Sequence, residues 1–334
     1  MDSLRVALIG YGTGGAVFHA PLISAAPGLD LAAVVTADPA RRAEVSRRYP
    51  RAELLDTPDL VWTGGYDLVV ITTPNLAHVP LARAALDAGL PVVVDKPVAP
   101  TAAQAWSLAG GPLVVPFHNR RWDGDFRTVA ALASDGVLGR VLRFESRFTR
   151  WRPQLKPGWK ETADPAAAGG VLYDLGAHLI DQAITLFGPP VDVYAELNVR
   201  RPGAAAVDDA FVALSHNGGV RSHLWMSAIS ADLGPRFRVL GDEAAYTSYG
   251  LDGQEQQLRD GLTPGDRGFG VTPPEAYGMV GTPGKARPHR TEAGRYQDFY
   301  PQVAAAVRGE ASPPVSLDDA VLGLEVIESA LERG

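Results

Sequence analysis

The chain has 334 residues, 46% of them hydrophobic, which suits two domains that each bury a sizeable core. It contains no cysteine, which excludes structural disulfides and thiolate metal sites, and its net charge of −7 argues against a nucleic-acid-binding face. Because no run of about 18 apolar residues could span a membrane and the N-terminus carries no signal-peptide pattern, we expect a cytoplasmic protein with neither membrane nor nucleic-acid partners.

Apolar runs alternate with helical patterns over residues 1–118. Strands are expected at Leu4–Gly10, Leu31–Thr36, Tyr66–Thr72, Pro91–Pro97 and Gly111–Asn119. Helices are expected at Ala16–Ala26, Pro39–Tyr49, 74–89 and Thr101–Gly110. Strands that are hydrophobic throughout and alternate with helices are typical of a parallel sheet covered on both faces. We therefore expect an α/β fold whose N-terminal domain, residues 1–118, is a Rossmann-type doubly wound parallel sheet.

From residue 119 the pattern changes to that of an α+β domain, which we place at residues 119–334. Helices are expected at 122–136, within 167–188, at Tyr296–Arg308 and at Leu317–Arg333. Strands are expected at Gly139–Arg150, Val191–Val199, Ala210–Ser215, Val220–Ser227, Phe237–Leu240 and Ala244–Tyr249. Alternating polar and apolar residues indicate an open, mostly antiparallel sheet. Residues 260–295 are rich in glycine and proline without a period, which indicates a long surface loop.

The stretch GYGTGG, Gly10–Gly15, directly follows the first expected strand and precedes a helix. This is the context of the G-x-G-x-x-G dinucleotide fingerprint. In that fingerprint Gly10 allows the turn, Gly12 allows the backbone to approach the pyrophosphate, and Gly15 allows close helix–strand packing. The helix N-terminus then presents unpaired amides to the phosphates. A tight turn without a ligand is the alternative, and the strand–helix context favours the dinucleotide.

The residues after the second expected strand bear on the choice of cofactor. The strand ends at Thr36, and the acid Asp38 comes late for binding the ribose 2′-hydroxyl of NAD. A small polar residue followed by two arginines, at 41 and 42, suits the 2′-phosphate of NADP. We therefore expect NADP, with NAD as the alternative; a solvated helix face is the other explanation for the arginines.

Lys96, in the stretch VVDKP, comes directly after a parallel strand, at the edge where open α/β sheets bind ligands. There it could polarise a substrate hydroxyl or contact the nicotinamide ribose; the alternative is an ordinary solvated lysine. The turn after the third expected strand, with Thr73, Asn75 and His78, belongs to the same edge. We expect the cofactor to contact Gly10, Gly12, Thr13, Gly15, Thr36, Arg41, Arg42, Thr73, Asn75, His78 and Lys96.

The stretch YDLGAHLID places Asp174 and His178 four residues apart, on one face of a helix, and Asp181 continues that face. An imidazole is a natural general base, and a carboxylate one turn away can orient it. Incidental polar pairs are the alternative, and a metal site lacks further ligands, so we expect no metal.

The stretch FHNRRWDGDF contains Asn119, Arg120 and Trp122, whose polar groups and aromatic ring could face a cleft and bind a polyol. A linker with exposed charges is the alternative. We expect these three residues to bind substrate together with Lys96, Asp174 and His178.

Taken together, these stretches resemble the glucose–fructose oxidoreductase / inositol dehydrogenase / MocA (Gfo/Idh/MocA) family. The match runs over nearly the whole chain and rests on GYGTGG, TPNLAH, a DKP where the family usually has EKP, and GGVLYDLGAHLIDQ. The stretches FHAP and NRRWDGDF are similar to those of the NADP-dependent scyllo-inositol dehydrogenase branch. Asp95 replaces the usual glutamate, and Ala37 stands where similar NADP-using sequences often have arginine.

The resemblance implies a cofactor-dependent oxidoreductase that moves hydride between a nicotinamide and a secondary hydroxyl of a cyclitol or sugar. In that family pattern Lys96 contacts substrate and nicotinamide, while Asp174 and His178 position the hydroxyl and exchange its proton. It also implies that the open sheet forms a subunit interface, so we expect a homodimer or homotetramer. Two alternatives stay open: a lyase or glycosidase that retains its NAD, and a non-catalytic redox sensor that binds the dinucleotide.

Overall fold

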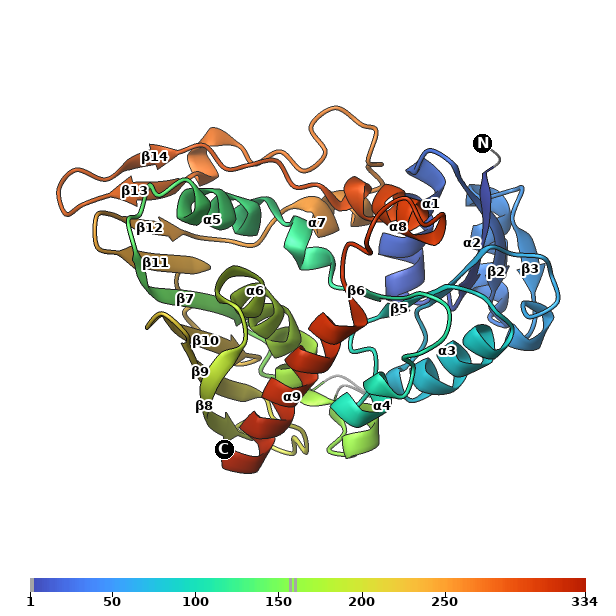
Figure 1. The fold of residues 1–334 in the computed structure, drawn as a ribbon, viewed down its shortest axis with the longest axis horizontal. Helices are drawn as coiled ribbons and strands as arrows, with labels where there is room; N and C mark the ends of the chain where they lie inside the picture. The colour runs from blue at the N-terminus through green and yellow to red at the C-terminus, as the bar shows by residue number, and fades with distance from the viewer. Residues whose placement is uncertain (1–2, 156–157, 159–160) are drawn as a thin grey trace. The chain divides into compact units, whose positions relative to one another are not determined.

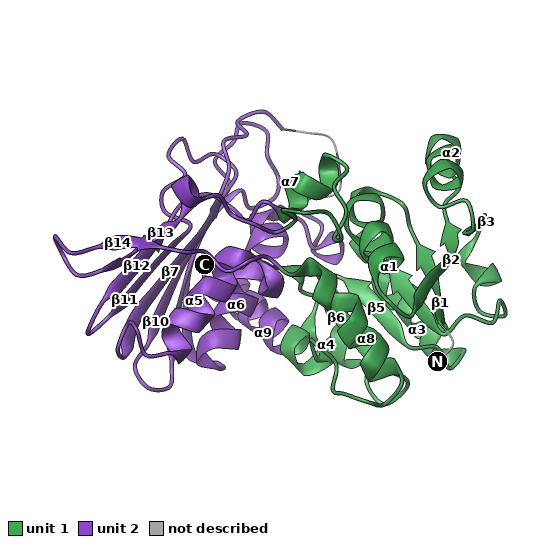
Figure 2. Cartoon of the chain, turned by 90° about the horizontal axis from the view of Figure 1, so that it is seen from above, with its two compact units in different colours: residues 1–119, 254–269, 295–321 green, residues 120–253, 270–294, 322–334 purple. Residues whose placement is uncertain are grey.

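The structure is a computed structural model that describes residues 3–155, 158 and 161–334. The chain forms two compact units, each built around its own sheet (Figure 1, Figure 2). Unit 1 comprises residues up to 119 with 254–269 and 295–321, and unit 2 comprises 120–253, 270–294 and 322–334. The domains expected at 1–118 and 119–334 stay a prediction; in the packing units, two later segments of the chain belong with the first.

The sheet of unit 1 is entirely parallel, with strand order β3-β2-β1-β4-β5-β6. The strands are β1 (Leu4–Ile9), β2 (Leu29–Val35), β3 (Glu53–Leu55), β4 (Leu68–Ile71), β5 (Val92–Asp95) and β6 (Val114–Phe117). The middle strands are buried almost throughout, because helices cover both faces of such a sheet. The expected Rossmann-type sheet is confirmed. The short strand β3 was not expected, since only Leu55 of its three residues is buried.

The helices of unit 1 follow the expected order along the chain. They are a π-helical turn (Gly14–His19), α1 (Ala20–Ala25), α2 (Pro39–Arg48), α3 (His78–Asp87) and α4 (Ala102–Trp106), with α7 (Gln254–Arg259) and α8 (Phe299–Val307) from later in the chain. Short 3-10 turns lie at Pro58–Leu60, Asn75–Ala77 and Tyr296–Asp298. The hydroxyl of Thr101 accepts a hydrogen bond from the Gln104 amide and caps α4, as a threonine before a helix predicts.

The sheet of unit 2 has eight strands in the order β14-β13-β12-β11-β7-β10-β9-β8. They are β7 (Val141–Thr149), β8 (Pro190–Asn198), β9 (Asp209–His216), β10 (Arg221–Ser227), β11 (Phe237–Gly241), β12 (Ala245–Ser248), β13 (Gly278–Gly281) and β14 (Arg287–His289). Only β7 and β10 pair in parallel. The expected open, mostly antiparallel sheet is therefore confirmed.

The expectation that residues 260–295 form one long surface loop is wrong. This segment contains a 3-10 turn (Pro274–Ala276) and the strands β13 and β14, which extend the sheet edge. Gly278 has no side chain because a Cβ there would collide with the Tyr246 hydroxyl on the neighbouring strand. Glycines and prolines that serve such close packing hide the alternating pattern by which a strand is recognised.

Helices α5 (Gly124–Ser134) and α6 (Ala177–Phe187) lie on one face of the second sheet (Figure 2). A 3-10 turn (Asn119–Trp122) precedes α5, a second one (Pro165–Ala167) and a π-helical turn (Leu172–Gly176) precede α6, and α9 (Leu317–Arg333) ends the chain. The alternation in β9 and β10 matches this arrangement: Val212 and Leu224 are buried, whereas Phe211 and Trp225 belong to the other face.

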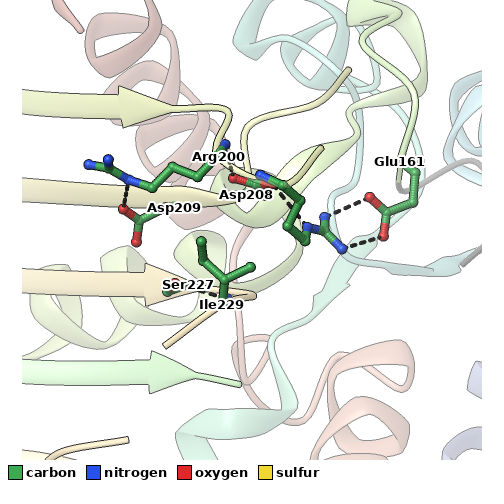
Figure 3. A network of polar contacts seen from close by, with 7 residues as sticks. Glu161, Arg200, Asp208, Asp209, Ser227 and Ile229 are labelled. Atoms are coloured by element: carbon green, nitrogen blue, oxygen red, sulfur yellow. Dashed lines mark hydrogen bonds and ion pairs between the residues drawn. The ribbon is translucent and has the colours of Figure 1, made fainter. Parts of the chain in front are cut away.

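An ion-pair network connects the residues that follow β8 with the start of β9 and with Glu161 (Figure 3). The Arg201 guanidinium donates to Asp208 at 2.9 Å and to Glu161 at 2.7 Å, and the Arg200 guanidinium donates to Asp209 at 2.5 Å. Burial opposes the charge of Asp208, but its hydrogen bonds to the backbone of the two arginines and to Arg201 lower its pKa. The network ties the segment that contains Glu161 to the end of the sheet from which Thr149 and Arg150 emerge.

Candidate active site

The glycine stretch lies at the carboxyl end of β1, beside β4, where the strand order of unit 1 reverses direction. Gly10 has φ +100, and a Cβ on it would lie 2.7 Å from the Thr72 carbonyl oxygen. A Cβ on Gly15 would collide with the Gly10 carbonyl oxygen. Both positions therefore exclude any side chain, because one needs a left-handed backbone and the other needs close contact between turn and strand.

Gly12 differs from these two glycines, because a Cβ there would meet nothing within 4 Å. Its lack of a side chain is not needed for packing within the unit, and it leaves the backbone open to an approaching group. Nearby, the buried hydroxyl oxygen of Thr73 has no hydrogen-bond partner among the described residues. An exposed backbone turn and an unused hydroxyl at the reversal point of the sheet fit the pyrophosphate of a dinucleotide.

Asp38 and Arg42 make the side-chain hydrogen bonds that fix the backbone after β2. The Asp38 carboxylate accepts hydrogen bonds from the amides of Ala40 and Arg41 and thus caps α2. The Arg42 guanidinium donates to the Thr36 carbonyl at 3.1 Å and to the Asp56 carboxylate at 2.8 Å. Of the two acids at this strand end, Asp38 therefore caps a helix and Asp56 binds Arg42, whose guanidinium lies at the strand tip.

The turn after β4 is connected to the segment after β5 through His78. Its ring is buried, with Nδ1 at 2.8 Å from the Pro97 carbonyl oxygen and Nε2 at 2.9 Å from the Thr73 carbonyl oxygen. Lys96 is half-buried directly after β5, next to Pro97. His78 therefore holds together the two loops that carry Thr73 and Lys96, and its contacts are to the backbone of unit 1.

Asp95, the last residue of β5, has several polar neighbours in unit 1. Its carboxylate accepts a hydrogen bond from the Thr72 hydroxyl at 3.1 Å and one from the Lys96 amide at 2.8 Å, and the His19 ring lies 3.8 Å away. Burial opposes ionisation of Asp95, but His19 above all, with His78 and Lys96, lowers its pKa to about 2. Asp95 is thus a carboxylate that positions the backbone of Lys96.

His19 and Tyr300 extend this arrangement into the core of unit 1. Both side chains are buried, and His19 Nδ1 lies 2.5 Å from the Tyr300 hydroxyl. Burial raises the pKa of Tyr300 well above its ordinary value, so the phenol keeps its proton and can donate it to Nδ1. The Nε2 proton of His19 then faces Asp95. Sequence reasoning missed both residues; FHAP was the only signal for His19, and Tyr300 has none.

In unit 2, Asp174 belongs to the π-helical turn before α6, and His178 is in the first turn of α6. The His178 ring is buried and packs against the Phe148 ring, with 6.4 Å between ring centroids. The Arg150 guanidinium lies 3.6 Å from the Asp174 carboxylate and 4.9 Å from the Phe148 ring. Arg150, which sequence reasoning also missed, follows β7 directly and brings a positive charge to the expected acid–base pair.

Helix α6, which carries His178, is hydrogen-bonded to Arg236, a buried arginine directly before β11. The Arg236 guanidinium donates to the Gln182 side chain at 2.9 Å and to the Ser146 hydroxyl at 2.6 Å. The Gln182 amide in turn donates to the Arg120 carbonyl at 2.9 Å. Because Gln182 is one turn beyond His178, these bonds restrict how α6 can rotate against β7.

In the stretch Asn119–Trp122, Arg121 is half-buried and the other three residues are buried, which excludes the alternative of a linker with exposed charges. The Arg120 guanidinium binds Asp123 at 3.0 Å and lies over the Phe148 ring. Arg121 binds Asp181 at 2.6 Å, so Asp181 has a structural partner although it shares a helix face with His178. Among the described residues no group of three or more histidine and acidic side chains is arranged to hold a metal ion.

Two family descriptions match the chain. Residues 4–109 match the NAD-binding Rossmann fold of the Gfo/Idh/MocA oxidoreductases, and residues 131–333 match the C-terminal alpha/beta domain of the same family. The chain belongs to this family. It is therefore an oxidoreductase, a dehydrogenase acting on CH–OH groups, with an NAD(P)-binding Rossmann domain.

Curated relatives and solved structures match over the full length. The uncharacterized oxidoreductase YdgJ of Escherichia coli is 39% identical over 99% of this chain and 96% of its own. The scyllo-inositol 2-dehydrogenase (NADP(+)) IolW of Bacillus subtilis is 33% identical over 99% of this chain and 94% of its own. The structure of yvaA from Bacillus subtilis has a TM-score of 0.92 at 33% identity, covering 99% of this chain and 97% of that chain. Among the described residues, no helix is long and apolar enough to cross a membrane.

Proposed function

We propose that the protein is an NADP-dependent dehydrogenase that acts on a secondary hydroxyl of a cyclitol or sugar. The observation that carries this proposal is the open backbone at Gly12, at the sheet edge that also carries Thr73 and Lys96. The 33% identity to a scyllo-inositol 2-dehydrogenase (NADP(+)) over nearly the whole chain supports the substrate class.

The end of β2 supports NADP over NAD. NAD binding in Rossmann domains uses an acid near this point to accept from the ribose 2′-hydroxyl, but Asp38 already accepts from two amides as a helix cap. The Arg42 guanidinium at the strand tip and the half-exposed Arg41 side chain instead offer positive charge to a 2′-phosphate. The Asp56 carboxylate on Arg42 keeps that guanidinium oriented without a phosphate.

The cofactor preference can be measured by titrating the purified protein with NADPH and NADH and following energy transfer from tryptophan to nicotinamide. We expect NADPH to bind at least about tenfold more tightly, since charge-assisted contacts to the additional phosphate are worth about 1.5–3 kcal/mol. Arg42→Gln and Arg41→Gln should weaken NADPH binding and leave NADH binding unchanged. Arg47→Gln, on the exposed side of α2, is the matched control. NADH binding as tight as NADPH binding would contradict the preference.

The catalytic roles follow from the chemistry of the side chains. Bound nicotinamide supplies the hydride chemistry. Lys96 stabilises negative charge that develops on the substrate oxygen, and His178 takes the hydroxyl proton during oxidation and returns it during reduction. Asp174, beside Arg150, orients the imidazole and the substrate hydroxyl.

Alanine variants test these roles separately from cofactor binding. Lys96→Ala should reduce turnover by about a hundredfold or more, the usual effect of losing one stabilising donor, and His178→Ala should reduce it by a similar factor. Both variants should still bind NADPH through the glycine turn. Turnover is followed as NADPH formation with a panel of cyclitols and sugars. Full activity in both variants would reject the assignment, and NAD that survives purification without net redox change would favour the cofactor-retaining lyase or glycosidase.

A further inference from the structure

A pocket of about 530 Å³ lies within unit 2 at the end of β7. Its wall is formed by four consecutive residues, 149–152, and by three apolar side chains from two later loops. Five of the lining residues are large or charged, namely Arg150, Trp151, Arg152, Leu233 and Leu251. The family motifs that identify the cofactor and the acid–base residues do not include these positions.

The pocket wall is built by hydrogen bonds between the two chain segments. The Arg150 amide donates to the Ser227 carbonyl at 2.8 Å, and the Arg152 amide donates to the Ala228 carbonyl at 2.7 Å. The Thr149 hydroxyl donates to the Leu233 carbonyl at 2.9 Å. These bonds continue the β7–β10 pairing beyond the strand ends, so the two arginines project from an ordered backbone.

The charge of the lining is positive, although the chain as a whole has a net charge of −7. Two of the lining side chains are arginines and none is acidic. Arg152 is exposed, and its guanidinium makes no ion pair with any residue in the described part of the chain. Guanidinium groups bind carboxylates and phosphates through paired hydrogen bonds, so this lining suits an anionic group.

Arg150 connects the pocket with the expected acid–base residues, and all of them belong to unit 2. It lines the pocket and also lies 3.6 Å from the Asp174 carboxylate. The Phe148 ring, which packs against His178, has the Arg150 guanidinium 4.9 Å from its centroid. Arg150 is therefore a residue that both lines the pocket and contacts Asp174. The indole of Trp151, which is 59% exposed, offers the apolar face of a sugar ring a surface to pack on.

We propose that this pocket binds a carboxylate or phosphate group of the substrate, so that the enzyme acts on an acidic sugar or cyclitol. The inference rests on the proposed function, because it identifies the substrate class of the same site. Arg152 and Arg150 hold the anionic group, Trp151 packs against the ring, and the hydroxyl that is oxidised lies toward Asp174 and His178.

The first experiment measures binding without turnover. Glucuronate, glucose 6-phosphate and neutral glucose are titrated by calorimetry into the full-length protein saturated with NADP. At least one acidic sugar should bind about tenfold or more tightly than glucose, as expected for a charge-assisted pair, and this advantage should decrease with added salt. Which acidic sugar binds more tightly decides between carboxylate and phosphate. Equal affinity for glucose and both acidic sugars would overturn the proposal.

Variants assign the effect to the pocket. Arg152→Gln should abolish the affinity advantage of the acidic sugar, and it should lower the ratio of kcat/KM for acidic over neutral substrates by about tenfold. Arg140→Gln is the matched control, since it removes an exposed arginine of unit 2 that pairs with Asp242 outside the pocket. An unchanged ratio in Arg152→Gln would overturn the proposal. Acidic sugars that bind but are oxidised by neither NADP nor NAD would overturn their assignment as substrates and leave only the anion pocket standing.

Discussion

At the ends of the parallel strands of unit 1, the hydrogen bonds of single acidic side chains determine which groups those side chains can bind. Asp38 follows β2 closely, and one oxygen of its carboxylate, Oδ1, accepts hydrogen bonds from two backbone amides. Asp95 is held below its ordinary pKa of 3.8, at about 2, although burial alone would raise the pKa. Both acids lie at the carboxyl edge of the sheet of unit 1, and both bind backbone amides there: one caps a helix and the other accepts from the Lys96 amide.

The lowered pKa of Asp95 predicts how stability depends on pH. A carboxyl group with a folded pKa below its unfolded value stabilises the fold above the unfolded pKa, and this contribution is lost as the pH falls from 3.8 toward about 2. The difference between a pKa of 3.8 and one of about 2 corresponds to about 2.5 kcal/mol, at roughly 1.4 kcal/mol per pKa unit. Asp95→Asn should therefore lower the free energy of unfolding by about this amount at pH 7, and by progressively less below pH 4.

Urea unfolding of Asp95→Asn and the parent protein between pH 7 and pH 3 measures this difference. Asp87→Asn, which removes an exposed carboxylate from the end of α3, is the control and should change stability little. A deficit in Asp95→Asn that is the same at every pH would show that the stabilising role of Asp95 does not depend on its charge.

Among whole elements, the turn between β1 and α1 combines tight packing against the sheet with an open stretch of backbone, within the six residues Gly10–Gly15. Gly10 and Gly15 are required by the turn itself and by its packing, whereas Gly12 has open space beside it. The helix that follows starts as a π-helical turn, Gly14–His19, before α1 continues it. That turn places His19 in the core beside Tyr300 and Asp95, so the segment expected to contact the cofactor also packs against the acid that binds the Lys96 amide.

Alanine substitutions separate these two requirements. Gly15→Ala should destabilise the protein by several kcal/mol or prevent folding, because its Cβ would overlap the Gly10 carbonyl oxygen. Gly12→Ala should fold with unchanged thermal stability and lose about tenfold or more in NADPH affinity, because the new methyl group occupies the space that the pyrophosphate needs. Circular dichroism melting curves and NADPH titrations of both variants provide the measurements. Unchanged NADPH affinity in Gly12→Ala would contradict the assignment of this turn to the dinucleotide.

In the whole molecule, the two compact units are not two consecutive halves of the chain. Residues 254–269 and 295–321 pack in unit 1, although the chain has completed most of unit 2 by then. Tyr300, which binds His19, comes from one of these returning segments. The assembly of the protein into a homodimer or homotetramer through the second sheet stays a prediction. The predicted interface is the face of that sheet that carries the clustered aromatic rings of Tyr194, Phe211 and Trp225.

The sequence by itself determined the parallel sheet, the open second sheet, the glycine turn and the positions of Lys96, Asp174 and His178 along their elements. These features are local, because apolar periodicity and turn-forming residues act over a few neighbouring positions. The tertiary structure alone decided the contacts between distant residues: His19 with Tyr300, Arg150 with Asp174, and Tyr246 over Gly278. No spacing in the chain encodes such contacts, because they arise only when the sheets bring strands far apart in sequence side by side.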